Sequence, residues 1–161
     1  MNTHADRAEA LFKSGYNCAQ SLIGAFEGEI GLDFETSMRL ASSFGGGMGR
    51  LREVCGALTG LFMVVGLQSG YSDPEDYEAK TRHYQLVQDL AARFRDLYGT
   101  ILCRDLLELE ETISEPIPEK RTEAYYQRRP CAEYIRFAAS LLDPARPESN
   151  PASKPDPDVE I

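Results

Sequence analysis

Apolar residues recur every three or four positions along most of the chain, a spacing that gathers them on one face of an α-helix. The longest such run lies over residues 74–98. It begins at Asp73-Pro74-Glu75, which combines a capping residue, a first-turn proline and an acidic residue, as helix starts commonly do. Gly99 follows the run, and glycine commonly ends a helix. The pattern predicts a helix over residues 74–98.

Six shorter segments show the same periodicity. Residues that favour a helix start precede three of them, namely Asn17, Thr100 and Pro130. The segments cover residues 5–13, 18–26, 34–44, 51–67, 101–109 and 131–142. No segment alternates apolar and polar residues over the length of a strand. The sequence therefore predicts an all-α fold, an irregular bundle of about six to seven helices.

The prolines divide the chain into two parts. Five of the nine lie in the last 19 residues, 143–161, where Val159 and Ile161 are the only large apolar residues. Such a segment buries too little surface to offset the entropy lost on ordering. We expect a single helical domain with four cysteines over residues 1–142, followed by a disordered or extended Pro-rich tail over residues 143–161.

The chain is strongly acidic. Its 161 residues carry a formal net charge of −9, and the pI is near 4.7. The sequence has no basic stripe, so we expect no binding to nucleic acid, and an acidic surface repels anionic lipid. Apolar residues make up 42% of the chain, which is enough to bury a core without cross-links.

Neither a membrane span nor an export signal is expected. The longest apolar stretch, Val54–Leu67, has 14 residues, whereas about 20 are needed to cross a bilayer. This stretch predicts a buried core helix. The N-terminus lacks the apolar segment of a signal peptide. We therefore expect a cytoplasmic protein, and in that reducing compartment a permanent disulfide framework is a less favoured use of cysteine.

Cysteine is the main candidate for chemistry, because the chain has four Cys, two His and no Trp. Three of the four, Cys18, Cys103 and Cys131, fall in the first turn of a predicted helix. Free backbone N–H groups and the positive end of the helix dipole lower the pKa of a thiol there and favour the thiolate. Basic residues adjoin two of these thiols: Arg104, Arg128 and Arg129.

Cys55 differs, because it is expected as a buried thiol inside the apolar helix over residues 51–67. Gly56 and Gly60 share its face and leave a groove for a closely packed helix or for a bulky group held by Cys55. Upstream, Gly45–Gly49 has four glycines in five residues. This run is either a flexible connection or a left-handed loop that turns N–H groups toward an anion. The candidate cofactor-binding glycines are Gly45, Gly46, Gly47, Gly56 and Gly60.

Together these motifs resemble the C_GCAxxG_C_C family of small redox-active proteins, over about residues 5–142. The motifs are Tyr16-Asn17-Cys18-Ala19-Gln20-Ser21, Phe44-Gly45-Gly46-Gly47, Cys55-Gly56-Ala57-Leu58-Thr59-Gly60, Cys103 and Cys131. One departure is the order Cys55-Gly56, where the family name has Gly before Cys. The resemblance implies a helical domain with four functional cysteines, without defining a substrate. A similar domain that accompanies an iron–sulfur centre in a split-Soret type cytochrome implies a cluster as cofactor.

Two redox functions follow if the four cysteines converge on one site. One is electron transfer through an Fe–S cluster, and the other is thiol–disulfide exchange. For a cluster, the metal ligands are Cys18, Cys55, Cys103 and Cys131. For exchange, Cys18 is the expected low-pKa attacking thiol and Cys55 its buried partner, which would make the protein an oxidoreductase.

Two further functions stay open at this stage. One is a non-catalytic helical binding module whose cysteines are structural. The other is a structural zinc site held by all four cysteines. The sequence also leaves the identity of a redox partner protein and the oligomeric state open.

Overall fold

The computed structural model describes residues 2–110 and 113–144. Within them no strand forms, and Val54 and Leu102 make an isolated bridge. The predicted all-α class is confirmed. From residue 145 onward the predicted tail lies outside the described residues. The helices are α1 (His4–Lys13), α2 (Cys18–Ala25), α3 (Phe34–Ala41), the 3-10 helix η1 (Ser42–Phe44), α4 (Gly45–Met48), α5 (Gly56–Ser69), α6 (Tyr77–Tyr98), α7 (Cys103–Leu106), α8 (Glu123–Arg128) and α9 (Cys131–Ser140).

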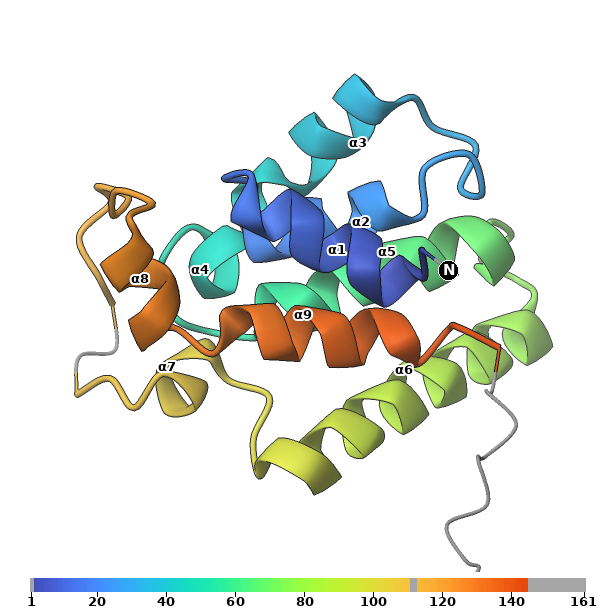
Figure 1. The fold of residues 1–161 in the computed structure, drawn as a ribbon. Coiled ribbons are helices and arrows are strands. Elements are labelled where there is room, and N and C mark those ends of the chain that lie inside the picture. Colours follow the sequence, from blue (N-terminus) through green and yellow to red (C-terminus); the bar gives the residue numbers. More distant parts are fainter. Residues whose placement is uncertain (1, 111–112, 145–161) are drawn as a thin grey trace, which may run out of the picture.

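Helix α5 is the centre of the core. It is apolar on nearly all sides, as a helix surrounded by protein must be, and Leu58, Leu61 and Val64 are fully buried. Helices α2, α9 and α6 pack against α5, and α1 packs across α2 and α9 (Figure 1). The expectation of a buried core helix here is confirmed. None of the helices in the described ranges is long and apolar enough to cross a membrane.

Two glycines let α2 and α5 meet backbone to backbone. A Cβ atom added at Gly60 would lie 2.9 Å from the carbonyl oxygen of Ala19, and one added at Gly56 would lie 2.9 Å from the Cβ of Cys18. Both distances are shorter than ordinary van der Waals contact. Helix α2 therefore fills the groove that the sequence predicts beside Cys55, and the tight-packing interpretation of this glycine pair holds.

Local capping explains where the structure departs from the predicted helix ends. Helix α6 begins at Tyr77, because the carboxylate of Asp76 accepts a hydrogen bond from the N–H of Ala79. Residues 74–76 form a turn before it. Helix α8 is absent from the prediction, since six residues give too little periodicity. Its start does carry a local signal, because the Thr122 hydroxyl accepts from the third N–H of the helix.

Two other predicted helices are shorter in the structure. Helix α7 covers only Cys103–Leu106, and its cap is Leu102 rather than Thr100. Helix α5 starts at Gly56 rather than at residue 51. The backbone at Arg50 and Arg52 has positive φ, which an α-helix excludes, so the chain reaches α5 as a loop.

The helix starts gather at one end of the bundle. Helices α2, α5 and α9 all begin there, and the short helices α4, α7 and α8 lie over that end (Figure 1). Helix α4 contacts α2, α5 and α7. Because every cysteine of the chain lies at or next to a helix start, this arrangement brings the four thiols to the same end of the molecule.

Gly60→Ala tests the α2–α5 contact. The added methyl group meets the backbone of Ala19, so we expect the free energy of unfolding to fall by about 1–3 kcal/mol. Gly66→Ala is the matched control in the same helix, because a Cβ there meets nothing within 4 Å. It should stabilise the protein by roughly 0.5–1 kcal/mol through helix propensity. Urea denaturation measures both changes, and a stability gain in Gly60→Ala would contradict the close contact.

Candidate functional site

All four cysteines lie at helix N-termini. Cys18, Cys103 and Cys131 are the first residues of α2, α7 and α9, as the sequence predicts. The expectation that Cys55 lies inside a helix is wrong, because Cys55 is the residue that directly precedes α5. Its N–H donates to the carbonyl of Ile101, 2.8 Å away, which holds it at the end of the loop.

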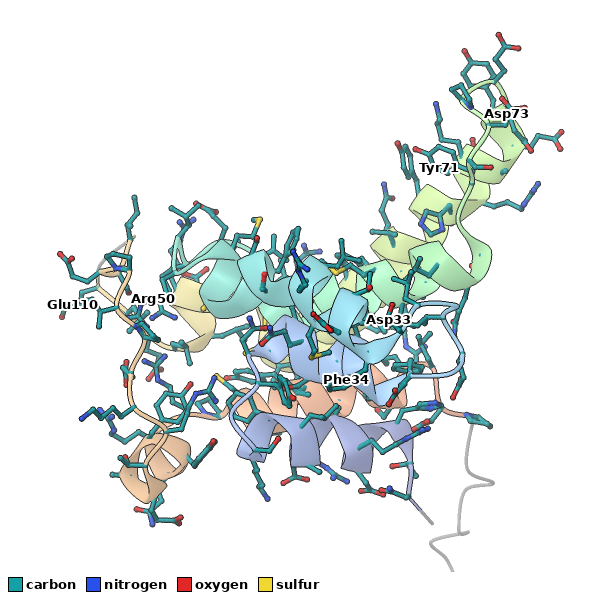
Figure 2. All side chains as sticks on the ribbon, turned by 90° about the horizontal axis from the view of Figure 1, so that it is seen from above. Asp33, Phe34, Arg50, Tyr71, Asp73 and Glu110 are labelled. Carbon is teal, nitrogen blue, oxygen red and sulfur yellow. The ribbon has the colours of Figure 1, made fainter. Side chains whose placement is uncertain are left out.

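A cavity of about 260 Å³ opens over three of these thiols. Cys18, Cys103 and Cys131 line it, whereas Cys55 is buried outside the lining. The charged residues of the wall are Arg50, Arg52, Arg121, Arg129 and Glu119. Arg50 marks this end of the molecule in Figure 2, opposite the tip formed by Tyr71 and Asp73. The cavity is thus lined by three thiols and four guanidinium groups, although Cys103 and Cys131 are themselves only 7% and 8% exposed.

Cys18 and Cys131 are neighbours in the cavity wall, and a hydrogen-bonding interaction between the two thiols shifts the pKa of both. This interaction, with Cys18 as donor, lowers the pKa of Cys131, and the positive charges of Arg129, Arg121 and Arg52 lower it further against the effect of burial. The same interaction and burial raise the pKa of Cys18 well above its ordinary value. Cys131 is therefore the more acidic thiol of the pair.

The prediction that Cys18 is the low-pKa thiol is therefore wrong. Both residues occupy the first turn of a helix, so the helix dipole does not distinguish them. The arginines do, because three of them act on Cys131. The proton shared by two adjacent sulfurs stays on the one that lies in the less positive environment.

The other two thiols are held in the protonated form. Burial raises the pKa of Cys55 to about 12, although the N–H groups of Ala57 and Leu58 act in the opposite direction. Burial also raises the pKa of Cys103. Arg52 partly offsets this rise, because its Nη1 donates a hydrogen bond to the sulfur of Cys103 at 3.5 Å. Each of the four thiols changes the pKa of at least one other. The four therefore share one electrostatic environment.

The glycine run forms a left-handed loop. Gly46, Gly47 and Gly49 have φ between 60° and 66°. The N–H groups of residues 49, 50, 52 and 53 donate back to carbonyls within the loop, so they do not point to an anion. Gly45 and Gly46 line the cavity, whereas Gly47 packs on Cys103, where a Cβ would lie 2.6 Å from the cysteine Cβ. The loop thus shapes the wall of the site.

Backbone hydrogen bonds fix this loop to the start of α7. The N–H of Cys103 donates to the carbonyl of Glu53 at 2.6 Å, and the N–H of Arg104 donates to that of Arg52 at 3.2 Å. Arg52 is only 3% exposed, and its Nε donates to the hydroxyl of Ser114 at 2.9 Å. This network holds the Arg52 side chain in the cavity wall.

Most of the cavity arginines are missing from the sequence prediction. Arg129 is the one basic neighbour of a cysteine in the sequence that also lines the cavity. Arg104 instead lies 3.6 Å from the carboxylate of Glu53, and Arg128 is exposed. The sequence gives only a weak signal for the other arginines of the cavity wall, since Arg50 and Arg52 simply follow the glycine run.

The metal-ligand prediction finds no geometric support in the part of the chain that the structure describes. No group of three or more His, Cys, Asp or Glu side chains is arranged there to hold a metal ion. The four cysteines do not form a ligand set for a cluster or for zinc as they stand. Both sites stay predictions, and we derive no chemical step through either.

Comparison with known proteins identifies the family of the chain. A family model described as "Putative redox-active protein (C_GCAxxG_C_C)" matches residues 16–144. The matched segment contains all four cysteines, the left-handed loop and the arginines of the cavity wall. Neither a curated protein nor a solved structure matches the chain.

Arg129→Gln tests the electrostatic cause of the acidic thiol. The variant removes a positive charge near Cys131, so its pKa should rise. The pH at which iodoacetamide alkylates Cys131 at half its maximal rate should then increase by about 0.5–1 unit, the effect of one partly screened charge. Mass spectrometry of the reduced protein, site by site, follows the reaction.

The matched control is Arg128→Gln. Arg128 adjoins Arg129 in sequence and also contacts Glu119, but it is not among the charges that lower the pKa of Cys131. Its replacement should leave the pH midpoint unchanged. In the unmodified protein, Cys131 should react at a lower pH than Cys18 and Cys55. Equal midpoints for Cys131 and Cys18 would contradict the assignment of the thiolate.

Proposed function

The chain belongs to the C_GCAxxG_C_C family of redox-active proteins, and on this premise we propose that it carries out thiol–disulfide exchange through Cys131 and Cys18. The observation that carries the proposal is that these two thiols are neighbours in the wall of one cavity, each at the start of a helix, with the pKa of Cys131 lowered and that of Cys18 raised. A thiolate with a protonated thiol in contact is the arrangement that exchange requires. Cys131, rather than Cys55, is the partner of Cys18 in this proposal.

In the first step the Cys131 thiolate attacks one sulfur of a disulfide substrate. A bond forms between the Cys131 sulfur and that atom, the disulfide bond of the substrate breaks, and the other half leaves as a thiolate. Only the thiolate is nucleophilic, so the arginines that lower the pKa of Cys131 increase the reactive fraction at neutral pH.

In the second step Cys18 resolves the mixed disulfide. Once the Cys131 sulfur is bonded, it is no longer charged, and the two interactions with it that raise the pKa of Cys18 are lost. Cys18 then gives its proton to the leaving sulfur and attacks the sulfur of Cys131. The Cys18–Cys131 disulfide forms and the second half of the substrate leaves as a thiol. The substrate disulfide is reduced by two electrons, and the cysteine pair is oxidised by two.

Cys55 and Cys103 take no step in this mechanism. Burial raises the pKa of each, whereas the pKa of Cys131, which is equally buried, is lowered. Their place beside the reactive pair suits a supporting role, since two neutral thiols next to Cys131 add no charge that would oppose its thiolate. An Fe–S cluster on all four cysteines is the alternative that the experiment below must distinguish.

Cys18→Ser should stop the reaction after its first step. With 2-hydroxyethyl disulfide as probe, this variant should accumulate a mixed disulfide on Cys131, because the resolving thiol is missing. The unmodified protein should instead release two thiols and form a Cys18–Cys131 disulfide. Intact-mass measurement and peptide mapping identify both products.

Two further variants complete the experiment. Cys131→Ser should abolish the fast reaction, whereas Cys103→Ser, which changes another thiol of the cavity wall, should retain it. A fast reaction in Cys131→Ser would overturn the proposal. Anaerobic purification of a brown protein with stoichiometric iron and sulfide would favour the cluster instead.

A further inference from the structure

We propose that the cavity over Cys131 selects small disulfides and thiols that carry carboxylate groups. The inference rests on the proposed exchange function and names its substrate class. It is carried by the charges of the cavity wall, which are opposite in sign to those of the whole chain. The cavity volume of about 260 Å³ suits part of a small molecule rather than a folded partner.

The wall of the cavity holds a local excess of positive charge. Four guanidinium groups line it against one carboxylate, that of Glu119, although the chain as a whole has a net charge of −9. The pKa of Arg50 is lowered first by burial and then by the charges of Arg52 and Arg129, with Glu119 acting in the opposite direction. The arginines therefore repel one another, and a bound anion would relieve that repulsion.

Most of these guanidinium groups bind neutral acceptors. Arg50 donates through Nε to the carbonyl of Glu115 at 2.6 Å, and Arg121 donates through Nη2 to the carbonyl of Tyr16 at 3.3 Å. Arg129 pairs with Glu119. Among the described residues, no carboxylate lies within salt-bridge distance of the other three arginines of the wall: Arg50, Arg52 and Arg121.

Arg121 has an unsatisfied hydrogen-bond donor. Its Nη1 atom is buried and has no hydrogen-bond partner within the described ranges. Its guanidinium carbon lies 4.7 Å from the ring centres of both Phe12 and Tyr125, so the group is held by its aromatic neighbours. A buried, unsatisfied donor on a fixed cation is costly, and Arg121 is one of the residues that line the cavity.

The exchange reaction itself strengthens this preference. Before the reaction, the negative groups at the cavity are the Cys131 thiolate and Glu119. Formation of the mixed disulfide removes the thiolate charge, so the wall becomes more positive while half of the substrate is covalently attached. A carboxylate on that half would then compensate the arginines until Cys18 attacks.

Three disulfides of similar size and different charge test the selectivity. They are 3,3′-dithiodipropionate (anionic), 2-hydroxyethyl disulfide (neutral) and cystamine (cationic). The rate of attack by Cys131 on each is divided by the rate of attack by free 2-mercaptoethanol, which removes differences in intrinsic reactivity. At low ionic strength the normalised rate for the anion should exceed that for the neutral probe by at least about tenfold. Added salt should reduce the difference.

Variants of opposite sign identify the charges responsible. Arg50→Gln should lower the preference for the anion, whereas Glu119→Gln should raise it. Arg82→Gln is the control, because it removes the same charge from an exposed position on α6, near Tyr84. The hydroxyl of Tyr84 is hydrogen-bonded to that of Tyr71, which lies at the tip opposite the cavity (Figure 2). Circular dichroism confirms that each variant is folded, and Glu119→Gln alone decides the question if Arg50→Gln does not fold.

The outcomes separate the two proposals. If all three probes react at Cys131 with equal normalised rates, exchange stands and the anion preference is overturned. An unchanged preference in both cavity variants overturns it as well. If none of the probes reacts at Cys131, the exchange function itself is overturned.

Discussion

The close contact between α2 and α5 is the constraint on which the site depends. Gly56 and Gly60 carry no side chain toward α2, so the two backbones meet at Ala19. Gly56 lies against Cys18 and Gly60 lies against Leu22, so the helices run in the same direction and begin side by side. Helix α9 begins at the same end, because Cys131 contacts Cys18. Several positive helix ends thus converge, and such a place favours a negative group.

Among the four cysteines, Cys131 is the one whose pKa is lowered. The charges of three arginines and a hydrogen bond from Cys18 favour ionisation of Cys131. Burial of the other sulfurs opposes ionisation of those sulfurs. A second thiolate would be repelled by the first at short range. In the proposed exchange reaction the pair holds one proton and one charge, and loss of that charge in the covalent step would make Cys18 reactive in its turn.

The left-handed loop is the structural device that supplies two of the arginines. Arg50 and Arg52 themselves have φ of 65° and 61°, a conformation that costs a residue with a side chain roughly 1–2 kcal/mol. Backbone hydrogen bonds within the loop and to the start of α7 hold it in this form. Among the described residues, two of the four non-glycine residues with positive φ, Arg50 and Arg52, line the cavity, and strained backbone is common at functional sites.

The sequence by itself determined what depends on neighbouring residues. Helical periodicity and residues that favour helix starts predicted the all-α class and placed Cys18, Cys103 and Cys131 in first turns, although the cap of α7 is Leu102 rather than Thr100. The start of α5, and with it the position of Cys55, was decided by a loop whose left-handed form depends on hydrogen bonds to residues near Cys103. A local pattern does not contain that information.

Only the tertiary structure decided which sulfur carries the charge. Cys18 and Cys131 are 113 residues apart in sequence and have the same local setting at a helix start. What distinguishes them is the field of Arg52, Arg121 and Arg129, which come from separate segments and meet only when α2, α7, α8 and α9 are packed at one end. Coulomb interactions depend on distance in space, so the charge of a thiol cannot be read from its neighbours along the chain.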